Sequence, residues 1–456
     1  MKYYVEPEKQ IPVRECDVVV AGGGTAGVIA AIAAARQGAR TILVESKGYT
    51  GGVAVEGGTA LHSFYNLWKA FPGVEKRQVV RGIPDEIIER LSGIQGGTSG
   101  HAEMERGFDY DSVNTSIDVE LYKIVSTEML VEAGVEIQFN TLVAGAVVEG
   151  SKVRAAITES RSRREAVFAK CFVDATGYGD LAAHAGAEFT EPNDHAVANS
   201  IGVGGVSLER YRDWLEEREG VGNLAYGVRD GEDNRLVRIT SIGEGFPKEL
   251  AEEARRIGMA GVVTSTHDDY FMFVKFNFKM PVSPTDRDEA TKAAIQLRRH
   301  HAEGIELIRK WIPGCEKAFI ARSSPSLAVR RGRMVVCDYD LPLDAIVNGI
   351  HFEDDIMSYG FHDCAPRIQI KDGGTYGIPY KALRVRGFDN LLAVGMMITS
   401  DWDAHMSTRN TVACMGQGQG AGTAAALCAR KNCSTRALPY PELKEALLAE
   451  RVYLEN

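Results

Sequence analysis

The sequence predicts an α/β protein built on a parallel β-sheet, with an α+β region inserted between the two ends of the chain. Residues 16–21 (CDVVVA) form a short run rich in β-branched residues, which is typical of a buried parallel strand. The alanine-rich residues 28–35 follow as a helix, and residues 41–45 (TILVE) form a second buried strand. These segments make a βαβ unit, and residues 391–395 (LLAVG) return to the same pattern near the other end.

Further elements of the first 190 residues fit this prediction. We expect an amphipathic helix, a strand, the two strands of a hairpin and a buried strand, in this order: 118–133, 135–139, 143–149, 153–159 and 170–174. The hairpin turns at Gly150 and Ser151, where glycine permits the backbone angles of a tight turn. A glycine- and alanine-rich helix over 416–430 closes the pattern after the last strand.

The pattern changes over residues 191–370, where we expect an inserted α+β domain that covers the substrate. Residues 271–280 (FMFVKFNFKM) alternate as in a half-buried strand. The phase of the alternation slips near Val274 and Lys275, which predicts a β-bulge.

A long helix follows this strand and sets the scale of the inserted domain. Thr285 and Asp288 form a capping box at its start, and it reaches Trp311. The changes of pattern predict a discontinuous cofactor domain, an inserted substrate or cap domain and a C-terminal helical tail, over these residues: 1–190 with 371–436, 191–370, and 437–456.

The composition excludes several classes of function. The chain has 456 residues, of which 45% are hydrophobic and 25% are charged, as in globular proteins rather than disordered or membrane-embedded ones. Its net charge of −10 is against nucleic-acid binding, which needs a basic surface. The 8 cysteines form no C-x-x-C pair, so neither a zinc site nor a dithiol redox centre is expected. The polar N-terminus and the lack of a long apolar run predict a cytoplasmic protein that does not cross a membrane.

The first strand runs into a glycine turn that is typical of dinucleotide binding. Gly22, Gly24 and Gly27 have the G-x-G-x-x-G spacing between a strand and a helix. The first glycine allows the tight turn, the second lets the backbone approach a pyrophosphate, and the third allows close packing of helix and strand. Glu45 ends the second strand, where a carboxylate accepts hydrogen bonds from ribose hydroxyls. The alternative is a glycine turn without a ligand, which the combination of strand, helix and acid disfavours.

Three more segments indicate which dinucleotide is bound. Gly51 and Gly52 follow Glu45 at the place of a second glycine loop beside the cofactor. Residues 174–177 (DATG), continuing to Asp180, close a buried strand in a turn that is typical of flavoproteins. The strand at 391–395 and the glycine-rich helix after it form the last pair, and a helix N-terminus stabilises negative charge on a reduced flavin.

The chain resembles the FAD-dependent oxidoreductases of the glutathione-reductase type. Within them it is similar to a broad bacterial group that is distantly like fumarate reductase flavoproteins. The segments that carry the resemblance are CDVVVAGGGTAGVIAAIAAARQGARTILVES, VDATGYGDLAAHAGAE, YGIPYKALRVRGFDNLLAVG and RNTVACMGQGQGAGTAAAL. The motifs and the resemblance together imply that FAD is bound by Gly22, Gly24, Thr25, Ala26, Gly27, Glu45, Ser46, Gly51, Gly52, Val143, Ala175, Thr176, Gly177, Asp180, Gly395, Met415, Gly416, Gly418 and Gln419.

Two departures from related flavoproteins narrow the prediction. The glycines at 202–205 (GVGG) precede a polar helix and not a second βαβ unit, so we expect no NAD(P)H domain and no disulfide-reductase mechanism. His62 has poor spacing for the histidine that carries covalent flavin in succinate dehydrogenases. We therefore expect FAD to be bound non-covalently.

Catalytic residues are expected between the last strand and the last helix, in residues 398–410 (ITSDWDAHMSTRN). His405 suits a general base at neutral pH, and Arg409, four residues later, would orient a carboxylate or an oxyanion from the same helix face. The alternative for both is a solvated loop or a supporting hydrogen bond. Trp402 is either a stacking platform for the substrate or a packed aromatic residue.

Substrate-binding residues are expected in the inserted domain and just after it. Arg330 and Arg331, in a basic cluster with Arg333, either hold an anionic substrate or form salt bridges with the acids at 338, 340 and 344. His362 and Tyr376 precede the last strand, where the resemblance implies proximity to the flavin ring.

The function that these observations predict is hydride transfer between a small hydroxyl-bearing substrate (a sugar, a polyol or a hydroxy acid) and FAD. His405 would remove the hydroxyl proton, and electrons would pass to oxygen or to an external acceptor. Alternatives are dehydrogenation or reduction of a carbon–carbon bond in a carboxylate, a non-redox flavoprotein such as an isomerase or lyase, and a flavin-bearing sensor. The partners we expect are a small-molecule substrate, an electron acceptor and, as in similar enzymes, a second copy of the chain.

Overall fold

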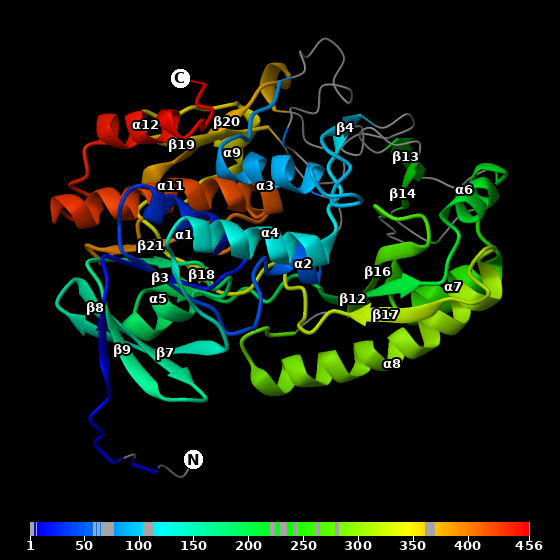
Figure 1. Cartoon of the computed structure of the whole chain (residues 1–456), viewed down its shortest axis with the longest axis horizontal. Helices are drawn as coiled ribbons and strands as arrows, with labels where there is room; N and C mark the ends of the chain where they lie inside the picture. The colour runs from blue at the N-terminus through cyan, green and yellow to red at the C-terminus, as the bar shows by residue number, and fades with distance from the viewer. Residues whose placement is uncertain are drawn as a thin grey trace.

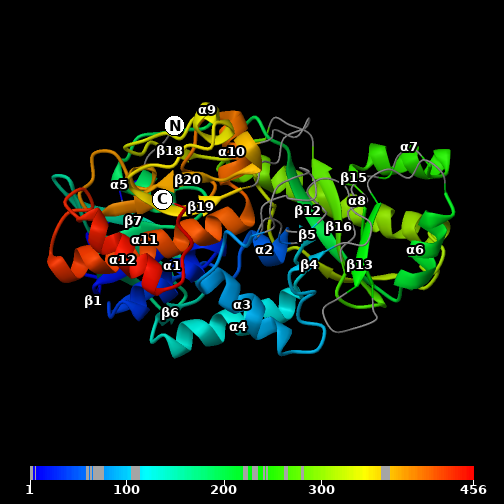
Figure 2. The ribbon, with the colours of Figure 1, turned by 90° about the horizontal axis from the view of Figure 1, so that it is seen from above.

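The computed structural model describes residues 4–5, 7–57, 61, 64, 77–103, 113–218, 224–228, 235–239, 242, 245–260, 265–278, 282–360 and 370–455. Two groups of elements lie side by side (Figures 1 and 2). One contains both ends of the chain, and the other consists of segments from its middle. Among the described helices, none has both the length and the apolar character needed to cross a bilayer.

A five-stranded sheet forms the centre of the first group. Its order is β21–β10–β2–β3–β6, and every neighbouring pair is parallel. The strands are β2 (Val18–Ala21), β3 (Thr41–Val44), β6 (Glu136–Gln138), β10 (Cys171–Asp174) and β21 (Leu391–Ala393). All residues of β2, β3, β10 and β21 are buried, because other elements cover both faces of the sheet. Four of them confirm strands predicted from continuous apolar runs, and β6 confirms the strand predicted at 135–139.

Helices cover one face of this sheet and a smaller sheet covers the other (Figure 1). The helices are α1 (Thr25–Arg36), α4 (Val119–Glu132) and α11 (Thr411–Lys431), and α1 packs along α11. The smaller sheet consists of β1 (Val13–Glu15), β9 (Arg164–Phe168), β8 (Lys152–Ser160) and β7 (Thr141–Glu149), in that order. The hairpin of β7 and β8 is confirmed, with Gly150 at a φ of +59° in its turn.

Helix α11 begins at Thr411, five residues before the start predicted for it. Its glycines let it approach α1 closely. A Cβ on Gly418 would collide with the carbonyl oxygen of Ala26, and one on Gly422 would collide with that of Ala30. These two glycines are therefore needed where the backbones of the two helices meet.

A second, antiparallel sheet forms the other group, in the order β15–β16–β12–β17. The strands are β12 (Val197–Gly204), β15 (Met259–Ala260), β16 (Tyr270–Phe278) and β17 (Phe319–Ser323), and the helices beside them are α6 (Leu208–Glu216), α7 (Lys248–Arg256) and α8 (Arg287–Trp311). These elements enclose an apolar core of their own. The predicted bulge lies in β16 between Phe271 and Val274, just before the expected position.

The long helix α8 reaches Trp311 as predicted, but its N-cap is Asp286 and not Thr285. The Asp286 carboxylate accepts hydrogen bonds from the backbone N–H groups of Asp288 and Glu289, both at 2.9 Å. The Thr285 hydroxyl instead donates to Glu191 at 2.6 Å. Asp and Thr are both good N-caps, so the sequence did not fix which of two neighbours would begin the helix.

The remaining elements connect these layers. They are α2 (Val53–Glu56), α3 (Ile83–Ser92), β4 (Ala102–Glu103), β5 (Val113–Asn114), α5 (Asp180–Ala185), β11 (Phe189–Thr190), β13 (Leu224–Val228), β14 (Arg235–Ile239), β18 (Met334–Val335), α9 (Leu343–Val347), β19 (Asp355–Tyr359), β20 (Tyr376–Pro379), α10 (Trp402–Thr408) and α12 (Tyr440–Ala449). Side chains of β18, α9 and β19 pack in the core of the first group, although residues 334–359 were assigned to the inserted domain. The return to the first core therefore begins before residue 371.

Candidate cofactor and substrate site

The turn between β2 and α1 contains three glycines, and the structure gives a different reason for glycine at each position. Gly22 has a φ of +94°, and a Cβ there would come within 2.5 Å of the carbonyl oxygen of Ala175. A Cβ on Gly27 would collide with the carbonyl oxygen of Gly22. Gly24 is different, because the nearest protein atom to an added Cβ, the Cα of Gly52, is 3.9 Å away. Within the described residues no contact requires glycine at 24, whereas a pyrophosphate against this backbone does, so the turn fits a dinucleotide.

Glu45 lies at the end of β3 against the same turn. One carboxylate oxygen accepts a hydrogen bond from the backbone N–H of Gly23 at 2.7 Å. The other accepts from the N–H of Lys47 at 2.7 Å and from the hydroxyl of Ser46 at 3.1 Å. These bonds hold the buried carboxylate in one orientation beside the glycine turn, as a ribose-binding acid requires.

The second glycine loop packs directly on the first. The N–H of Gly51 donates to the carbonyl of Gly23 at 2.9 Å, and the hydroxyl of Thr25 donates to the carbonyl of Gly51 at 3.1 Å. A Cβ on Gly52 would lie 2.8 Å from the Cα of Gly24. The structure therefore brings together two glycine segments that are about one helix and one strand apart in sequence.

The DATG turn at the end of β10 completes this edge of the sheet. Asp174 is buried, and its carboxylate accepts from the N–H and hydroxyl of Thr176 at 3.0 and 2.8 Å and from the N–H of Ala182 at 2.8 Å. Burial raises the pKa of Asp174 to about 6, although these donors oppose that shift. Asp174 thus fixes the turn that sets Ala175 against Gly22.

The rest of this turn leads into α5. Gly177 has a φ of +81°, and its nearest neighbour beyond the turn is the end of the Met396 side chain. The N–H of Asp180 donates to the hydroxyl of Thr176 at 2.9 Å, while its carboxylate pairs with Arg333 at 3.1 Å. Asp180 therefore joins the predicted turn to the basic segment at 330–333.

The last strand reaches the same edge through a glutamine that the sequence analysis missed. The N–H of Val394 donates to the carbonyl of Asp174 at 3.0 Å. Gln417 accepts from the N–H of Gly395 at 2.8 Å and donates to the carbonyl of Thr408 at 2.7 Å. It thereby joins β21, α10 and α11. Glutamine recurs at 417 and 419, and sequence alone did not show which one faces the strand.

Several residues predicted to bind FAD instead have protein contacts on other faces of α11. Gln419 accepts from the N–H of Ile83 at 3.1 Å and donates to the carbonyl of Glu450 at 3.2 Å, so it fastens α3 to the C-terminal segment. Gly416 faces Met357 and Gly418 faces Ala26. Close packing explains why positions 416 and 418 are glycine. The N-terminus of α11 lies at 411, so neither of these glycines is at the end of the helix. Met415 on α11 and Val143 on β7 are both buried.

Helix α10 carries the predicted catalytic pair. Asp401 is its N-cap, and the Asp401 carboxylate accepts hydrogen bonds from the backbone N–H groups of Asp403 and Ala404. His405 is completely buried, and its Nε2–H donates to the carbonyl of Met396 at 2.8 Å. Burial, and then the charge of Arg409, lowers the pKa of His405 well below its usual value. Arg409 is the C-cap of α10 and directly precedes Asn410, the N-cap of α11.

The complete burial of His405 is against the prediction that it removes a proton from the substrate. A substrate atom must come within hydrogen-bond distance of a general base. Nδ1 of His405 is also buried and has no hydrogen-bond partner among the described atoms. The geometry fits a neutral histidine that positions the Met396 carbonyl.

A second histidine, His195, lies near the first and was not predicted. Its ring stacks on Trp402, with ring centres 5.1 Å apart and planes 21° apart. Nδ1 lies 3.3 Å from the carbonyl oxygen of Ala196. Because a carbonyl oxygen only accepts, Nδ1 carries the hydrogen and Nε2 has a free lone pair.

The charges that act on His195 come from three separate parts of the chain. Burial lowers its pKa to about 4, followed by the positive charges of Arg330, Arg409 and Lys275. Lys275 is a buried residue of β16, and Arg330 lies after β17. We call His195, Lys275, Arg330 and Arg409, with Trp402, the cationic cluster. No local sequence pattern marks it, because its members come together only in the fold.

Arg331 borders the cluster but is itself engaged. Only 5% of its side chain is exposed, and it pairs with Asp194 at 3.1 Å. It also donates to the carbonyl of Ser400 and lies over the ring of Trp402. Arg331 therefore helps to hold Trp402 and the start of α10 in place.

The acids proposed as salt-bridge partners of the basic segment have other partners. Arg333 pairs with Asp180 and Glu191 instead. The three acids bind as follows: Asp338 pairs with Arg384 and Arg436, Asp340 accepts from Ser400, and Asp344 accepts from Asn348. Nearness in sequence was a poor guide to ion pairing here, because the chain turns away after residue 335.

Tyr376 does not line the cluster. Its side chain is completely buried on β20, and its hydroxyl lies 2.6 Å from that of Ser407. Burial raises its pKa above the usual range, so the hydroxyl stays protonated. The contact that the structure gives the Tyr376 hydroxyl is thus Ser407, and its predicted contact with substrate stays a prediction. His362 and His62 lie outside the described residues.

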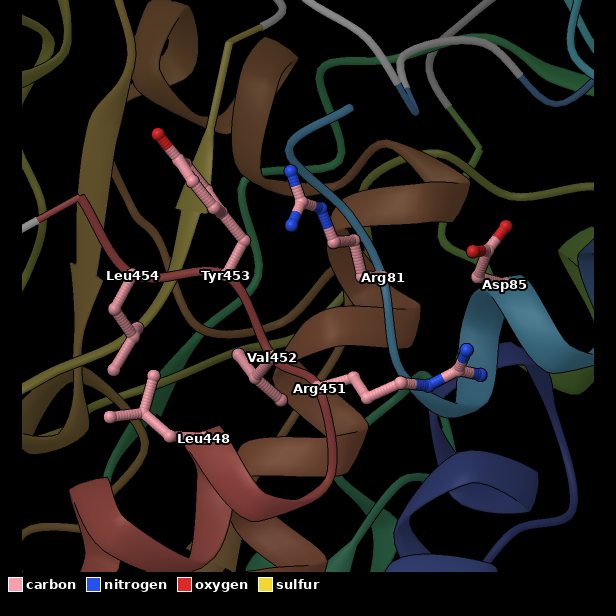
Figure 3. A pocket seen from close by; sticks show the side chains of 7 residues that line it. All are labelled: Arg81, Asp85, Leu448, Arg451, Val452, Tyr453 and Leu454. Carbon is pink, nitrogen blue, oxygen red and sulfur yellow. The ribbon is translucent and has the colours of Figure 1, made fainter. Parts of the chain in front are cut away.

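A cavity of about 510 Å³ lies elsewhere, between the start of α3 and the segment after α12 (Figure 3). Its lining consists of Arg81, Asp85, Leu448, Arg451, Val452, Tyr453 and Leu454. No residue predicted to bind cofactor or substrate belongs to it. Its polar groups have protein partners, such as His101 for Asp85 at 2.7 Å and Glu89 for Arg451 at 3.4 Å.

Comparisons with known proteins agree with the flavin prediction. A profile of the family described as FAD dependent oxidoreductase matches residues 17–447. A segment of the chain is 37% identical over 83 residues to 3-oxosteroid 1-dehydrogenase of Mycolicibacterium smegmatis, and 38% identical over 84 residues to the protein of that name in Mycobacterium tuberculosis. Each match covers 18% of this chain and only 14% of the relative.

Solved structures resemble the whole chain more loosely. A geranylgeranyl bacteriochlorophyll reductase-like protein from Thermoplasma acidophilum is 13% identical, with a TM-score of 0.47 over 96% of this chain and 84% of that one. A p-nitrophenol 4-monooxygenase from Pseudomonas putida is 13% identical, with a TM-score of 0.46 over 97% of this chain and 89% of that one.

Proposed function

Because this chain belongs to the FAD dependent oxidoreductase family, we propose that it uses FAD to oxidise a small hydroxy acid. The observation that carries the proposal is His195, whose ring stacks on Trp402 and whose pKa is lowered by burial and then by the positive charges of Arg330, Arg409 and Lys275. In a protein with a net charge of −10, positive charge gathered at one half-buried ring favours the binding of an anion there.

The glycine edge of the parallel sheet would hold the cofactor. Gly24 leaves room for the pyrophosphate, Glu45 would accept from the ribose, and the N-terminus of α11 would face the flavin. FAD, when bound, supplies the acceptor for a hydride.

The cationic cluster would orient the substrate at this cofactor. Arginine holds a carboxylate through two parallel hydrogen bonds, and Arg330 and Arg409 are the candidates for this role. Lys275 would add a buried positive charge. Arg409 immediately precedes α11, so a carboxylate bound to it lies beside the end of the helix that we assign to the flavin.

A second candidate is dehydrogenation of a carbon–carbon bond in a carboxylate. The same cations would hold that substrate, and the segment similar to 3-oxosteroid 1-dehydrogenase supports dehydrogenation as the reaction type. The two candidates differ in the bond oxidised and not in the way that the anion is held.

The test is anaerobic reduction of the FAD-loaded protein, followed in its visible spectrum. The panel contains hydroxy acids (lactate, glycolate, glycerate), uncharged polyols of similar size, and saturated dicarboxylates such as succinate. We expect bleaching by a hydroxy acid and none by the matched polyol. Bleaching by succinate alone would favour the second candidate, and bleaching by polyols alone would contradict the anionic substrate.

An arginine variant separates binding from chemistry. Arg330→Gln should raise KM for the acid about 10- to 100-fold, since a charged hydrogen bond contributes about 1.5–3 kcal/mol. Arg287→Gln, an exposed residue at the start of α8, is the matched control and should leave KM unchanged.

A further inference from the structure

We propose that His195 is the catalytic base, so that its Nε2 receives the proton of the substrate hydroxyl. This inference rests on the proposed function and adds the residue that accepts the proton. Of His195 and His405, the two histidines that the structure describes here, His195 is the one that combines partial exposure with a ring nitrogen able to accept, because His405 is completely buried.

The ring of His195 is held in the orientation that a base needs. Stacking on Trp402 fixes its plane, and the bond from Nδ1–H to the Ala196 carbonyl fixes its tautomer. Arg331 lies on the same indole with its centre 5.5 Å away and ties it to Asp194. The lone pair on Nε2 of His195 therefore points in one fixed direction, in which it can accept a proton.

The proposed step balances in atoms and electrons. The O–H bond of the substrate breaks and its proton goes to Nε2 of His195. The adjacent C–H bond breaks, its hydrogen leaves with both electrons to the flavin, and the C–O bond becomes a carbonyl. The substrate loses two electrons to FAD and one proton to the protein.

The cationic cluster makes the basicity of His195 depend on whether an anion is bound. In the free protein, burial and then the charges of Arg330, Arg409 and Lys275 lower the pKa of His195 to about 4, so its ring is neutral at pH 7. A carboxylate bound to these cations offsets their charge, which strengthens the histidine as a proton acceptor only when substrate is present. Among the described residues, Asp194, Arg331 and His405 also bear on this ring, and His405 stays neutral over the same pH range.

The experiment compares His195→Gln with wild type in two measurements on the FAD-loaded protein. The first is the rate of flavin reduction, without oxygen, by the hydroxy acid that reduces wild type. The second is the dissociation constant of oxalate, a carboxylate with no hydroxyl to oxidise, read from the flavin spectrum. We expect reduction to slow about 10²- to 10⁴-fold while oxalate affinity changes less than about threefold, because the removed ring is neutral.

The matched control is His184→Gln, an exposed histidine at the end of α5, which should match wild type in both measurements. An H195Q protein that reduces its flavin at the wild-type rate would overturn the proposal. A parallel loss of reduction and of oxalate binding would overturn it too, because it indicates a structural role.

The wild-type protein provides a test that needs no variant. As the pH is lowered, kcat should begin to fall at a higher pH than kcat/KM does. The pH dependence of kcat reports the pKa of the base in the enzyme–substrate complex, and that of kcat/KM reports its pKa in the free protein. Coincident pH dependences would contradict the role of the bound anion. If no hydroxy acid reduces wild type, the proposed function itself fails; if one does and H195Q is unaffected, only the role of His195 fails.

Discussion

The packing of α11 on α1 predicts that one added methyl group will have very different effects on stability at neighbouring glycines. Gly418→Ala and Gly422→Ala each place a Cβ on a backbone carbonyl of α1, at Ala26 and Ala30. Backbone cannot rotate away, so the two helices must separate. Gly416→Ala places its Cβ 2.5 Å from the terminal methyl of Met357, which can turn aside.

The change in unfolding free energy is the sum of two opposing contributions. Each substitution gains about 1 kcal/mol of helix propensity, because alanine replaces glycine inside a helix. Overpacking costs about 1–3 kcal/mol, and contact with backbone belongs at the upper end of that range. We therefore expect G418A and G422A to lose about 2 kcal/mol of unfolding free energy, and G416A to stay within about 1 kcal/mol of wild type.

Cofactor affinity separates the two destabilised variants. Ala26 lies within the glycine turn, whereas Ala30 lies one helical turn further along α1. Displacing Ala26 moves the backbone that we assign to the pyrophosphate. G418A should therefore weaken FAD binding about tenfold more than G422A does, at a similar loss of stability.

The assay is urea unfolding of the FAD-free proteins by circular dichroism, together with titration of FAD by fluorescence. G416A is the control for helix propensity, since it has the same substitution in the same helix. If G418A and G422A are as stable as G416A, α11 and α1 are not in contact at these glycines. If G418A and G422A bind FAD equally well, the link between helix packing and the cofactor site is wrong.

Three further outcomes follow from the same edge of the sheet. Glu45→Ala leaves two backbone N–H groups without an acceptor and should raise the Kd for FAD about 10- to 100-fold in the titration. Gln417→Ala leaves the N–H of Gly395 and the carbonyl of Thr408 without their hydrogen-bond partner, so the unfolding free energy should fall by about 2–4 kcal/mol. A loss below about 1 kcal/mol would contradict the role of these two hydrogen bonds. Because burial raises the pKa of Asp174 to about 6, the folded FAD-free protein binds this proton more tightly than the unfolded chain. Its contribution to stability should therefore fall by about 3 kcal/mol as pH rises from about 3 to about 7, a slope that Asp174→Asn lacks in urea unfolding at each pH.

The assignment to FAD dependent oxidoreductases and the α/β fold were both predicted from sequence and are confirmed. Buried parallel strands are short continuous apolar runs, so local composition is enough to find them. The finer assignment to the glutathione-reductase type, the domain boundaries and the residues that contact FAD stay predictions.

Sequence alone left the roles of particular site residues open for one reason, which is that a residue type can serve two purposes. Glycine in a helix has the same appearance in sequence whether it meets a cofactor or another helix, and Gly418 meets Ala26. A histidine beside aspartates suggests a base, but His405 is buried under the carbonyl of Met396. Burial depends on what the rest of the chain places around a residue, and local patterns do not contain that information.

The sequence by itself determined the parallel sheet, the glycine turn with its acid, and the flavin chemistry that they support. Each depends on residues within about thirty positions of one another, whose spacing is set by strand and helix geometry. The tertiary structure alone decided the cationic cluster, because His195, Lys275, Arg330 and Arg409 come from four separate segments. Electrostatic fields depend on distance in space, and only the folded chain brings these charges to one histidine.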